Sequence, residues 1–293
     1  MNSRQSPFFR LLALGTLVSV ILAAPAVLEA GKKKKPKDKP PAGDQGGGGQ
    51  QGGGGGSQQQ GGGENTPPAQ EPPPPEVRTV DRQLWEYKTG PARSTIDSVA
   101  DKAETNGAVA AALGRVYEQE KKYGDSEAQL RRATELSPND PAAYVYLGET
   151  LLRQRKEGDA SAAFRKAEEL GGAQGGKDGD YYRGVALQRL RRYDEAVQTL
   201  ERAREADPGN ALIPFQIGVA RVFQEQWQPA VDQLNRAVEM DSGLAYAYFY
   251  RGLAASEIGR KDLLVNDMER FLALAPAAPE ADRAKAILRA AKR

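Results

Sequence analysis

The residue types available for chemistry are few, because the 293-residue chain contains neither cysteine nor histidine. Such a chain has no disulfide, no thiolate or imidazole metal ligand and no imidazole base. A pair of carboxylates could still act as acid and base, but adjacent acids such as Glu168 and Glu169 carry little signal. The sequence has no phosphate-binding glycine loop, nucleophile elbow or metal-ligand spacing. We therefore expect no enzyme activity, no metal and no cofactor, with a carboxylate-pair hydrolase as the alternative.

The charge of the chain is unevenly placed. The net charge is +2, yet the part from Arg78 onward holds 33 basic and 33 acidic residues. Proteins that bind nucleic acid usually present a basic face. The neutral body therefore predicts that no nucleic acid is a partner.

Residues 1–30 are predicted to be a secretory signal peptide. Arg4 and Arg10 give it a positive start, residues 11–28 are apolar, and two small-residue endings follow. The apolar stretch is also long enough to span a bilayer, and the lysine-rich sequence after it favours retention as an anchor. We expect an exported protein, periplasmic or secreted, with a membrane-anchored form as the alternative. Any membrane contact would be made by this segment.

Residues 31–77 form a linker rich in Lys, Gly, Gln and Pro. Runs of Gly and Gln cannot bury enough apolar surface to offset chain entropy, so the linker is predicted to be disordered. Its proline-rich end favours polyproline II structure. We interpret the linker as a spacer, and the alternative is a docking segment in its proline- or lysine-rich parts.

The rest of the chain repeats with a period of 34 to 36 residues. Five glycines mark the period: Gly114, Gly148, Gly184, Gly218 and Gly252. Sixteen residues after each glycine stands a large apolar residue: Leu130, Phe164, Leu200, Leu234 and Met268. A fixed period of this length indicates stacked structural units.

Each unit is expected to be two antiparallel helices, A and B. Neither helix can bury its apolar stripe alone, so neighbouring units must stack. Glycine in helix A costs about 1 kcal/mol in helix propensity relative to alanine. Its recurrence therefore predicts that helix B approaches closely there, with the large residue sixteen positions later filling the core. Pro or Gly twenty-four positions later is expected to end helix B.

These residues resemble the tetratricopeptide repeat (TPR) family, whose pattern is aromatic-x-x-Leu-Gly-x-x-Tyr followed by Ala, Phe, Ala and Pro. The segments "YVYLGETLL" at 144–152 and "VAAALGRVYEQEKKYGDS" at 109–126 match it. The resemblance implies an all-α, right-handed solenoid of about five helix pairs. The expected units are 107–140, 141–176, 177–210, 211–244 and 245–278, with a degenerate helix pair at 78–106 and a capping helix at 279–293.

The sequence departs from the family pattern at several places. "GGAQGGKDG" at 171–179 adds two residues between units two and three. We expect a longer loop there, and a flexible joint is the alternative. Arg183 and Arg251 replace the leucine expected before the glycine, and Pro214 stands where an aromatic residue is common.

In this family the inner groove is lined chiefly by helix A. The resemblance implies that positions three before and one, four and five after the repeat glycine face this groove. The predicted partner-binding residues are Val145, Leu152, Arg153, Tyr181, Gln188, Arg189, Phe215, Val222, Phe223 and Phe249. Apolar anchors beside arginines suit an extended or helical peptide. The alternative is that Phe215, Phe223 and Phe249 only pack between helices, as stripes at helical spacing often do.

These observations predict a non-enzymatic protein–protein interaction scaffold of the cell envelope or secreted space. It would hold a peptide or protein segment in an apolar and aromatic groove. The alternative is a membrane-tethered assembly factor that uses the uncleaved N-terminal segment and the flexible linker as a leash. The identity of the partner is left open.

Overall fold

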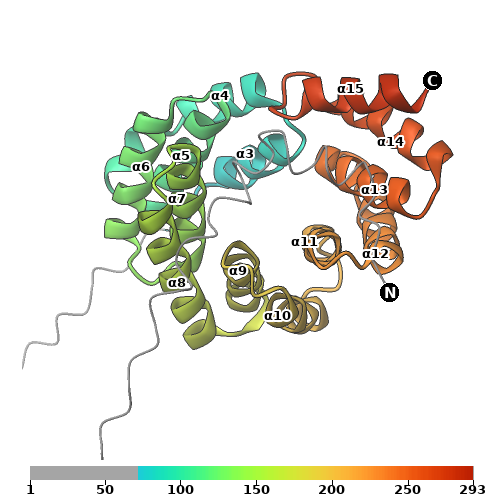
Figure 1. Cartoon of the computed structure of the whole chain (residues 1–293). Coiled ribbons are helices and arrows are strands. Elements are labelled where there is room, and N and C mark those ends of the chain that lie inside the picture. The colour runs from blue at the N-terminus through green and yellow to red at the C-terminus, as the bar shows by residue number, and fades with distance from the viewer. Residues whose placement is uncertain (1–71, 293) are drawn as a thin grey trace, which may run out of the picture. The chain divides into compact units, whose positions relative to one another are not determined.

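The computed structural model describes residues 72–292, so the predicted signal segment and almost all of the linker lie outside the described residues. The described chain forms thirteen α-helices and one short 3₁₀ helix, with no strand among them (Figure 1). The prediction of an all-α fold is confirmed. Among these helices, none combines the length and the apolar character needed to cross a membrane.

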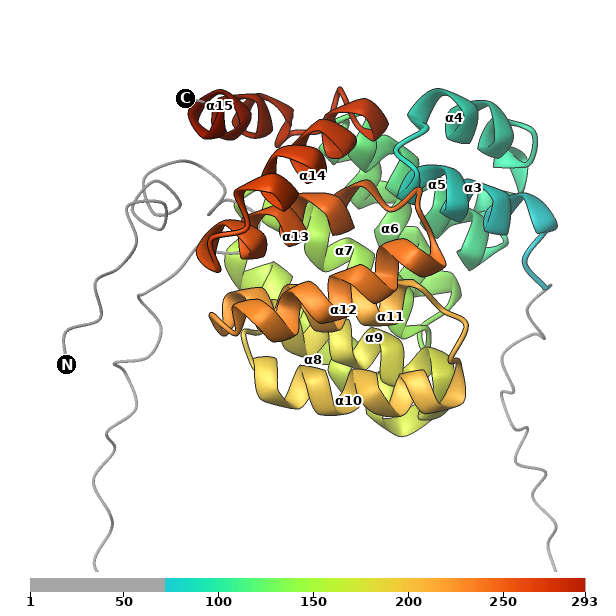
Figure 2. The same cartoon turned by 90° about the vertical axis from the view of Figure 1, so that its right-hand side faces the viewer.

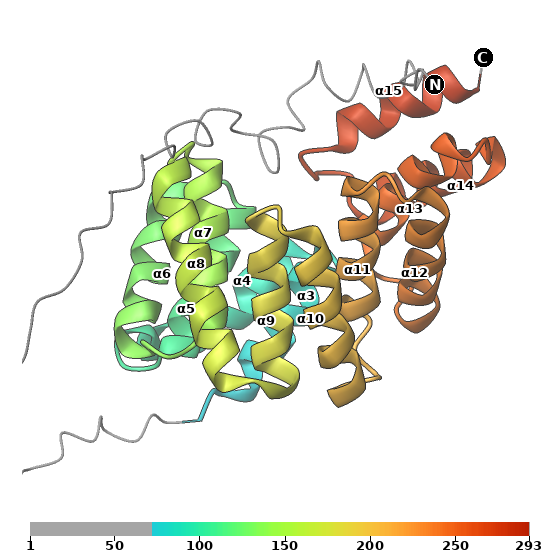
Figure 3. The same ribbon diagram turned by 60° about the horizontal axis from the view of Figure 1, so that its bottom comes forward.

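Each helix packs mainly against the helices before and after it in the chain. The α-helices are α3 Pro75–Trp85, α4 Thr89–Asp97, α5 Gly107–Gln119, α6 Tyr123–Leu136, α7 Pro141–Arg153, α8 Glu157–Gln174, α9 Gly176–Arg189, α10 Tyr193–Ala206, α11 Leu212–Phe223, α12 Trp227–Met240, α13 Ala245–Glu257, α14 Lys261–Leu274 and α15 Ala281–Ala291. The 3₁₀ helix spans Ala100–Glu104. Figures 2 and 3 show the helix pairs stacked side by side along the chain.

Several A helices begin at a capping side chain. The side-chain oxygen of Asn106 accepts hydrogen bonds from the backbone N–H groups of Ala108 and Val109 at the start of α5. Asp140 caps α7 in the same way, with Pro141 at the first helical position. Both residues lie eight positions before a repeat glycine. Such caps satisfy backbone donors that the first turn of a helix leaves unpaired.

The A helices end at a left-handed residue seven positions after the repeat glycine. These residues are Lys121, Arg155, Arg191, Glu225 and Gly259, with φ between 59° and 78°. In the first unit the N–H groups of Lys121 and Lys122 donate to the carbonyls of Glu118 and Tyr117, both at 2.9 Å. This is the Schellman end, which satisfies the last carbonyls of a helix.

Tyr87, between α3 and α4, has the same left-handed backbone at φ 58°. Its position places Val80 in the glycine column, 34 residues before Gly114. The pair α3–α4 therefore follows the register of the other units, with a larger residue where they carry glycine.

The repeat glycines let the two helices of a pair touch. A Cβ added to any of them would lie 2.5 to 2.7 Å from the side chain sixteen residues later. The pairs are Gly114 with Leu130, Gly148 with Phe164, Gly184 with Leu200, Gly218 with Leu234 and Gly252 with Met268. All five partners are buried. Close approach of helix B thus accounts for the recurring glycine.

The longer loop expected at 171–179 is wrong. Helix α8 continues through Gly172 to Gln174, and α9 begins at Gly176, so the two added residues extend a helix. Gly175 alone separates the helices, with φ 61° and ψ −168°. A Cβ on Gly171 would lie 2.6 Å from the carbonyl oxygen of Gly179, so these glycines serve a tight helix crossing.

Arg251, which replaces the leucine of the family pattern, forms an ion pair with a buried carboxylate. Its guanidinium binds both carboxylate oxygens of Asp267 on α14, at 2.6 and 2.9 Å, and donates to Asn235 on α12. The Asp267 side chain is 2% exposed. Burial raises the pKa of Asp267, and the bonds from Arg251 oppose that rise. The pair joins three consecutive helices at a position where the first two units have leucine.

The stack of residues 72–292 curves so that its first inner helix meets later ones. In Figure 1, α3 lies on the inside of the curve, facing α11 and α13. Trp85 contacts Phe215 on α11, and Tyr87 contacts Tyr246 on α13. The Glu86 side chain also reaches the turn between α12 and α13, 3.3 Å from where a Cβ on Gly243 would stand. These contacts surround the candidate site.

Candidate binding cavity

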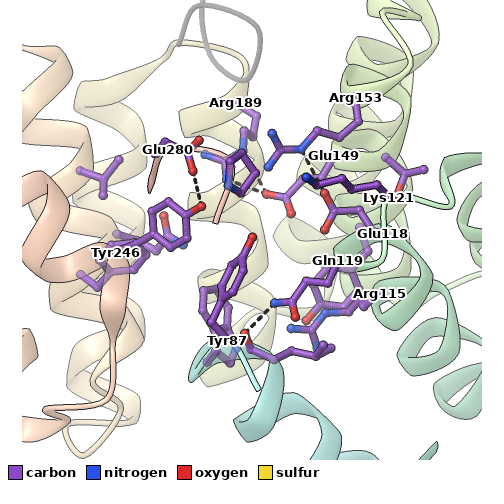
Figure 4. A pocket seen from close by; sticks show the side chains of 18 of the residues that line it. Tyr87, Arg115, Glu118, Gln119, Lys121, Glu149, Arg153, Arg189, Tyr246 and Glu280 are labelled. Carbon is purple, nitrogen blue, oxygen red and sulfur yellow. Dashed lines mark hydrogen bonds and ion pairs between the residues drawn. The ribbon is translucent and has the colours of Figure 1, made fainter. Parts of the chain in front are cut away.

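A cavity of about 200 Å³ lies on the inside of the curve (Figure 4). Helices α3, α5, α6, α7, α9, α11 and α13 all contribute to its wall, together with the connection between α14 and α15. Its charged lining residues are Arg115, Glu118, Lys121, Glu149, Arg153, Arg189 and Glu280. Its aromatic lining residues are Trp85, Tyr87, Tyr123, Tyr146, Phe215, Tyr246 and Tyr250. Aromatic and charged side chains therefore both line the cavity.

Two ion pairs connect neighbouring helices across the wall. Arg153 Nε donates to Glu118 Oε1 at 3.0 Å, and Arg189 Nη2 donates to Glu149 Oε1 at 2.6 Å. Burial raises the pKa of Glu118, and the charge of Arg153 acts in the opposite direction. These carboxylates are held by guanidinium groups, which fits a recognition surface better than an acid–base pair.

Arg115 is held between aromatic rings. Its guanidinium lies 4.3 Å from the ring centre of Tyr146 and 5.9 Å from that of Trp85, and it forms an ion pair with Asp81 on α3. A cation over a ring face is attracted by the ring quadrupole. Arg115 thereby binds α3 to the α5 and α7 wall of the cavity.

The opposite side of the cavity is closed by aromatic contacts. Trp85 packs edge-on against Phe215, with ring centres 6.4 Å apart, and Tyr87 packs at 6.1 Å from Tyr246. The Tyr246 hydroxyl donates a hydrogen bond to Glu280. Burial raises the pKa of Tyr87 to about 12, so its hydroxyl stays protonated.

The predicted groove residues fall into two groups. Arg153, Arg189 and Phe215 line the cavity. The others do not, and all of them are buried or partly buried among the helices: Val145, Leu152, Tyr181, Gln188, Val222, Phe223 and Phe249. Phe249 is fully buried against Phe271, with ring centres 5.0 Å apart. Its assignment to a binding groove is wrong, and core packing explains it.

Of the residues three before the repeat glycine, only Phe215 lines the cavity. The column two before the glycine supplies Tyr146, Gln216 and Tyr250. The column one after it, which the family resemblance places in the groove, supplies Arg115, Glu149 and Val219. Alternation of Asp81, Arg115 and Glu149 in successive units could have revealed this face, because opposite charges at one register form ion pairs between stacked helices.

Trp85 and Tyr87 also line the cavity, and the sequence pattern does not predict them as binding residues. Counting one more period back from Gly114 reaches Val80, and Trp85 then shares the column of Arg153 and Arg189. Because Val80 stands where the other units have glycine, the glycine spacing does not show that the repeat register includes this segment. Within residues 72–292 no group of three acidic side chains is arranged to hold a metal ion.

Comparison with known proteins supports the repeat assignment. Residues 111–178 and 159–211 match the family described as tetratricopeptide repeat. A search of curated proteins finds no match.

Solved structures show a similar fold. TTC0263, a thermophilic TPR protein of Thermus thermophilus, is 19% identical over 62% of this chain and 98% of its own, with a TM-score of 0.51. The human IFIT1 dimer with PPP-AAAA is 16% identical over 67% of this chain and 49% of its own, with a TM-score of 0.53.

At these identities the structures show the fold alone. The family match identifies residues 111–211 as tetratricopeptide repeats, and the repeat glycines packed against helix B continue the same arrangement to Gly252.

Proposed function

We propose that this chain is a non-enzymatic scaffold that binds a peptide segment of a partner protein in the concave cavity. Tetratricopeptide repeat solenoids are protein-interaction folds. The observation that carries the proposal is the cavity itself, where side chains from seven helices converge. Aromatic and arginine side chains dominate binding energy at protein interfaces, and both are concentrated there.

The charges of the cavity favour a peptide over a polyanion. Four cationic and three anionic side chains line it. Binding of nucleic acid depends on neutralising many phosphates with basic residues, and this balance does not supply them. A peptide with mixed polar and aromatic character fits the lining better.

The volume limits how much of a partner can enter. About 200 Å³ is below the usual size of a small-molecule pocket, and it accommodates one or two side chains. The partner is therefore expected to insert anchor side chains and to leave most of its surface outside the cavity.

The test is selection of peptides from a random library on the immobilised full chain. The double variant Glu118→Ala/Arg153→Ala removes one cavity ion pair without leaving either charge unpartnered. The control is Arg260→Ala/Asp262→Ala, an exposed pair outside the cavity. We expect Kd for selected peptides to rise at least tenfold in the first variant and less than twofold in the control. Equal affinity in both variants would place the binding site elsewhere.

We further propose that the scaffold works in the periplasm or after secretion. The support is the sequence of residues 1–30, with its positive start and apolar run. The alternative is a membrane-tethered assembly factor, supported by the lysine run that follows. Mass spectrometry of the native protein distinguishes them: a chain that starts near Val27 or Gly31 has been cleaved, and one that retains residues 11–28 is anchored.

A further inference from the structure

The end of α3 and the turn after it line the cavity, although stacking of neighbouring units does not require them to be there. In a solenoid each unit contacts only its neighbours. Trp85 and Phe215 are 130 residues apart in sequence, and Tyr87 and Tyr246 are 159 apart, yet each pair is in ring contact. These contacts join the first helix pair to units four and five. They occur where the curvature of the stack brings its first helix pair against later units.

The segment 84–87 is held in the way that bound peptides are held. The carbonyl of Leu84 accepts a hydrogen bond from Gln119 Nε2 at 2.7 Å. The Trp85 ring contacts the Phe215 ring, with centres 6.4 Å apart, and the guanidinium of Arg115, which lies 5.9 Å from the Trp85 ring centre. A main-chain hydrogen bond combined with side-chain pockets is a common mode of peptide recognition.

The second aromatic position is occupied by tyrosine. The Tyr87 ring packs against that of Tyr246, with ring centres 6.1 Å apart, and the Tyr246 hydroxyl donates a hydrogen bond to Glu280. Tryptophan, one intervening residue and tyrosine thus describe what the cavity binds within its own chain.

We infer that segment 84–87 is an internal ligand of the cavity, and that the external partner is a peptide with a Trp-x-Tyr pair that displaces it. The inference rests on the proposed function and specifies its partner. Removal of Trp85 and Tyr87 would expose the walls formed by Phe215, Tyr246 and Arg115 to water. An incoming peptide without two aromatic side chains would leave that apolar surface uncovered.

The first experiment supplies the internal ligand as a separate peptide. A labelled peptide of residues 82–89, RQLWEYKT, is titrated into full-length protein and followed by fluorescence anisotropy. We expect it to bind the Trp85→Ala/Tyr87→Ala variant at least tenfold more tightly than the unaltered chain. The matched control, Tyr144→Ala/Tyr248→Ala, removes two partly buried tyrosines outside the cavity and is expected to show no gain.

A second measurement covers the case in which that variant does not fold. The chain has two tryptophans, so Trp227→Phe leaves Trp85 as the only one. Saturation of this variant with a library-selected peptide whose tryptophan is replaced by phenylalanine, which keeps an aromatic ring, is expected to shift Trp85 emission to longer wavelength, because the Trp85 ring leaves the cavity for water. Unchanged emission would overturn the inference.

The remaining outcomes separate this inference from the proposed function. Selected peptides that lack aromatic residues, yet lose binding in Glu118→Ala/Arg153→Ala, would overturn the inference and leave the proposed function standing. Equal affinity of RQLWEYKT for the altered and unaltered chains would also overturn it. Dimerisation of the unaltered chain, abolished by Trp85→Ala/Tyr87→Ala, would assign the cavity to a second copy and overturn it as well.

Discussion

At the scale of single residues, the repeat glycines differ in how much their neighbours can yield. The Cβ of an alanine at 218 would meet Leu234 Cγ at 2.5 Å, close to the branch point of that side chain. At 252 it would meet the terminal methyl of Met268 at 2.7 Å. The methionine end can rotate away, whereas the leucine branch can move only if the helices separate.

We predict that Gly218→Ala lowers the free energy of unfolding by about 1–3 kcal/mol, the usual cost of overpacking a core. Gly252→Ala should cost less, since the gain of about 1 kcal/mol in helix propensity offsets part of its contacts with the Met268 methyl at 2.7 Å and Asp267 Cβ at 3.2 Å. Gly158→Ala is the control, because nothing lies within 4 Å of its added Cβ. Urea denaturation measures all three, and equal losses at 218 and 252 would contradict the packing argument.

A second residue-scale feature is the pairing of Glu120 with α4. Arg93 donates to both carboxylate oxygens of Glu120, at 2.7 and 2.8 Å, and Lys122 lies 2.9 Å from it. The hydrogen bond from Arg93 lowers the pKa of Glu120 to about 2. A carboxyl whose pKa is lower in the folded than in the unfolded state stabilises the fold above its unfolded pKa, and the stabilisation is lost as pH falls.

Glu120→Gln is therefore expected to reduce stability by roughly 1 kcal/mol at pH 7, the magnitude of a partly exposed ion pair. The difference from the unaltered chain should shrink below pH of about 4.5 and vanish as pH approaches 2. Urea unfolding at pH 7, 4 and 2.5 tests this. Glu104→Gln, at an exposed acid 3.5 Å from Arg132, is the control and should show a smaller loss at pH 7. A constant difference across pH would contradict the assignment.

At the scale of elements, the junction of α8 and α9 shows where propensity and packing disagree. Five glycines in nine residues predict a loop, yet the backbone is helical except at Gly175. The reason is the close approach of Gly171 to the Gly179 carbonyl, which no side chain permits. Tertiary packing has overridden a weak local preference for non-helical structure.

Neighbouring glycines in α8 provide a direct test. We predict that Gly171→Ala costs about 1–3 kcal/mol of stability, because its Cβ would clash with backbone. Gly172→Ala should be neutral or stabilise by up to about 1 kcal/mol, since its nearest neighbour is the Arg183 side chain at 3.6 Å. Thermal unfolding of both variants measures the contrast. Equal tolerance at both positions would favour a flexible joint.

The elements were the most predictable part of the molecule. Glycines recur every 34 to 36 residues, and each is followed sixteen positions later by Leu, Phe or Met. A closely packed helix pair explains this pattern, which predicts both the repeat period and the pairing of the helices. The cavity face was harder to predict. A shift of one residue turns a helical position by about 100°, which separates the buried Phe249 from the cavity-lining Tyr250. Apolar character alone does not distinguish these two positions.

At the scale of the whole described chain, the contact between distant units changes how stability is distributed. The terminal unit of a linear solenoid frays without affecting distant repeats. Here Trp85 also contacts α11, so the α3–α4 pair is coupled to the fourth unit. This coupling arises from the curvature of the entire stack, which no single repeat sequence encodes.

Trp85→Ala is accordingly expected to increase amide hydrogen exchange in α11 and α13 as well as in α3. Ile96→Val serves as the control, because Ile96 is fully buried in α4 and does not line the cavity. The increase in amide hydrogen exchange caused by Ile96→Val should be confined to α3, α4 and α5. Hydrogen–deuterium exchange mass spectrometry reads out both, and a Trp85→Ala effect restricted to α3–α5 would mean that the stack behaves linearly.

The position of Glu86 beside Gly243 offers a covalent handle on this closure. The Glu86 side chain lies 3.3 Å from the point where a Cβ at 243 would stand, within the reach of a disulfide. The chain has no cysteine of its own, so Glu86→Cys/Gly243→Cys would create a single bridge without mispairing. Oxidation would join the turn after α3 to the turn between α12 and α13 by a covalent bond, and a reductant would release it. The redox state would then control whether a peptide can reach the cavity.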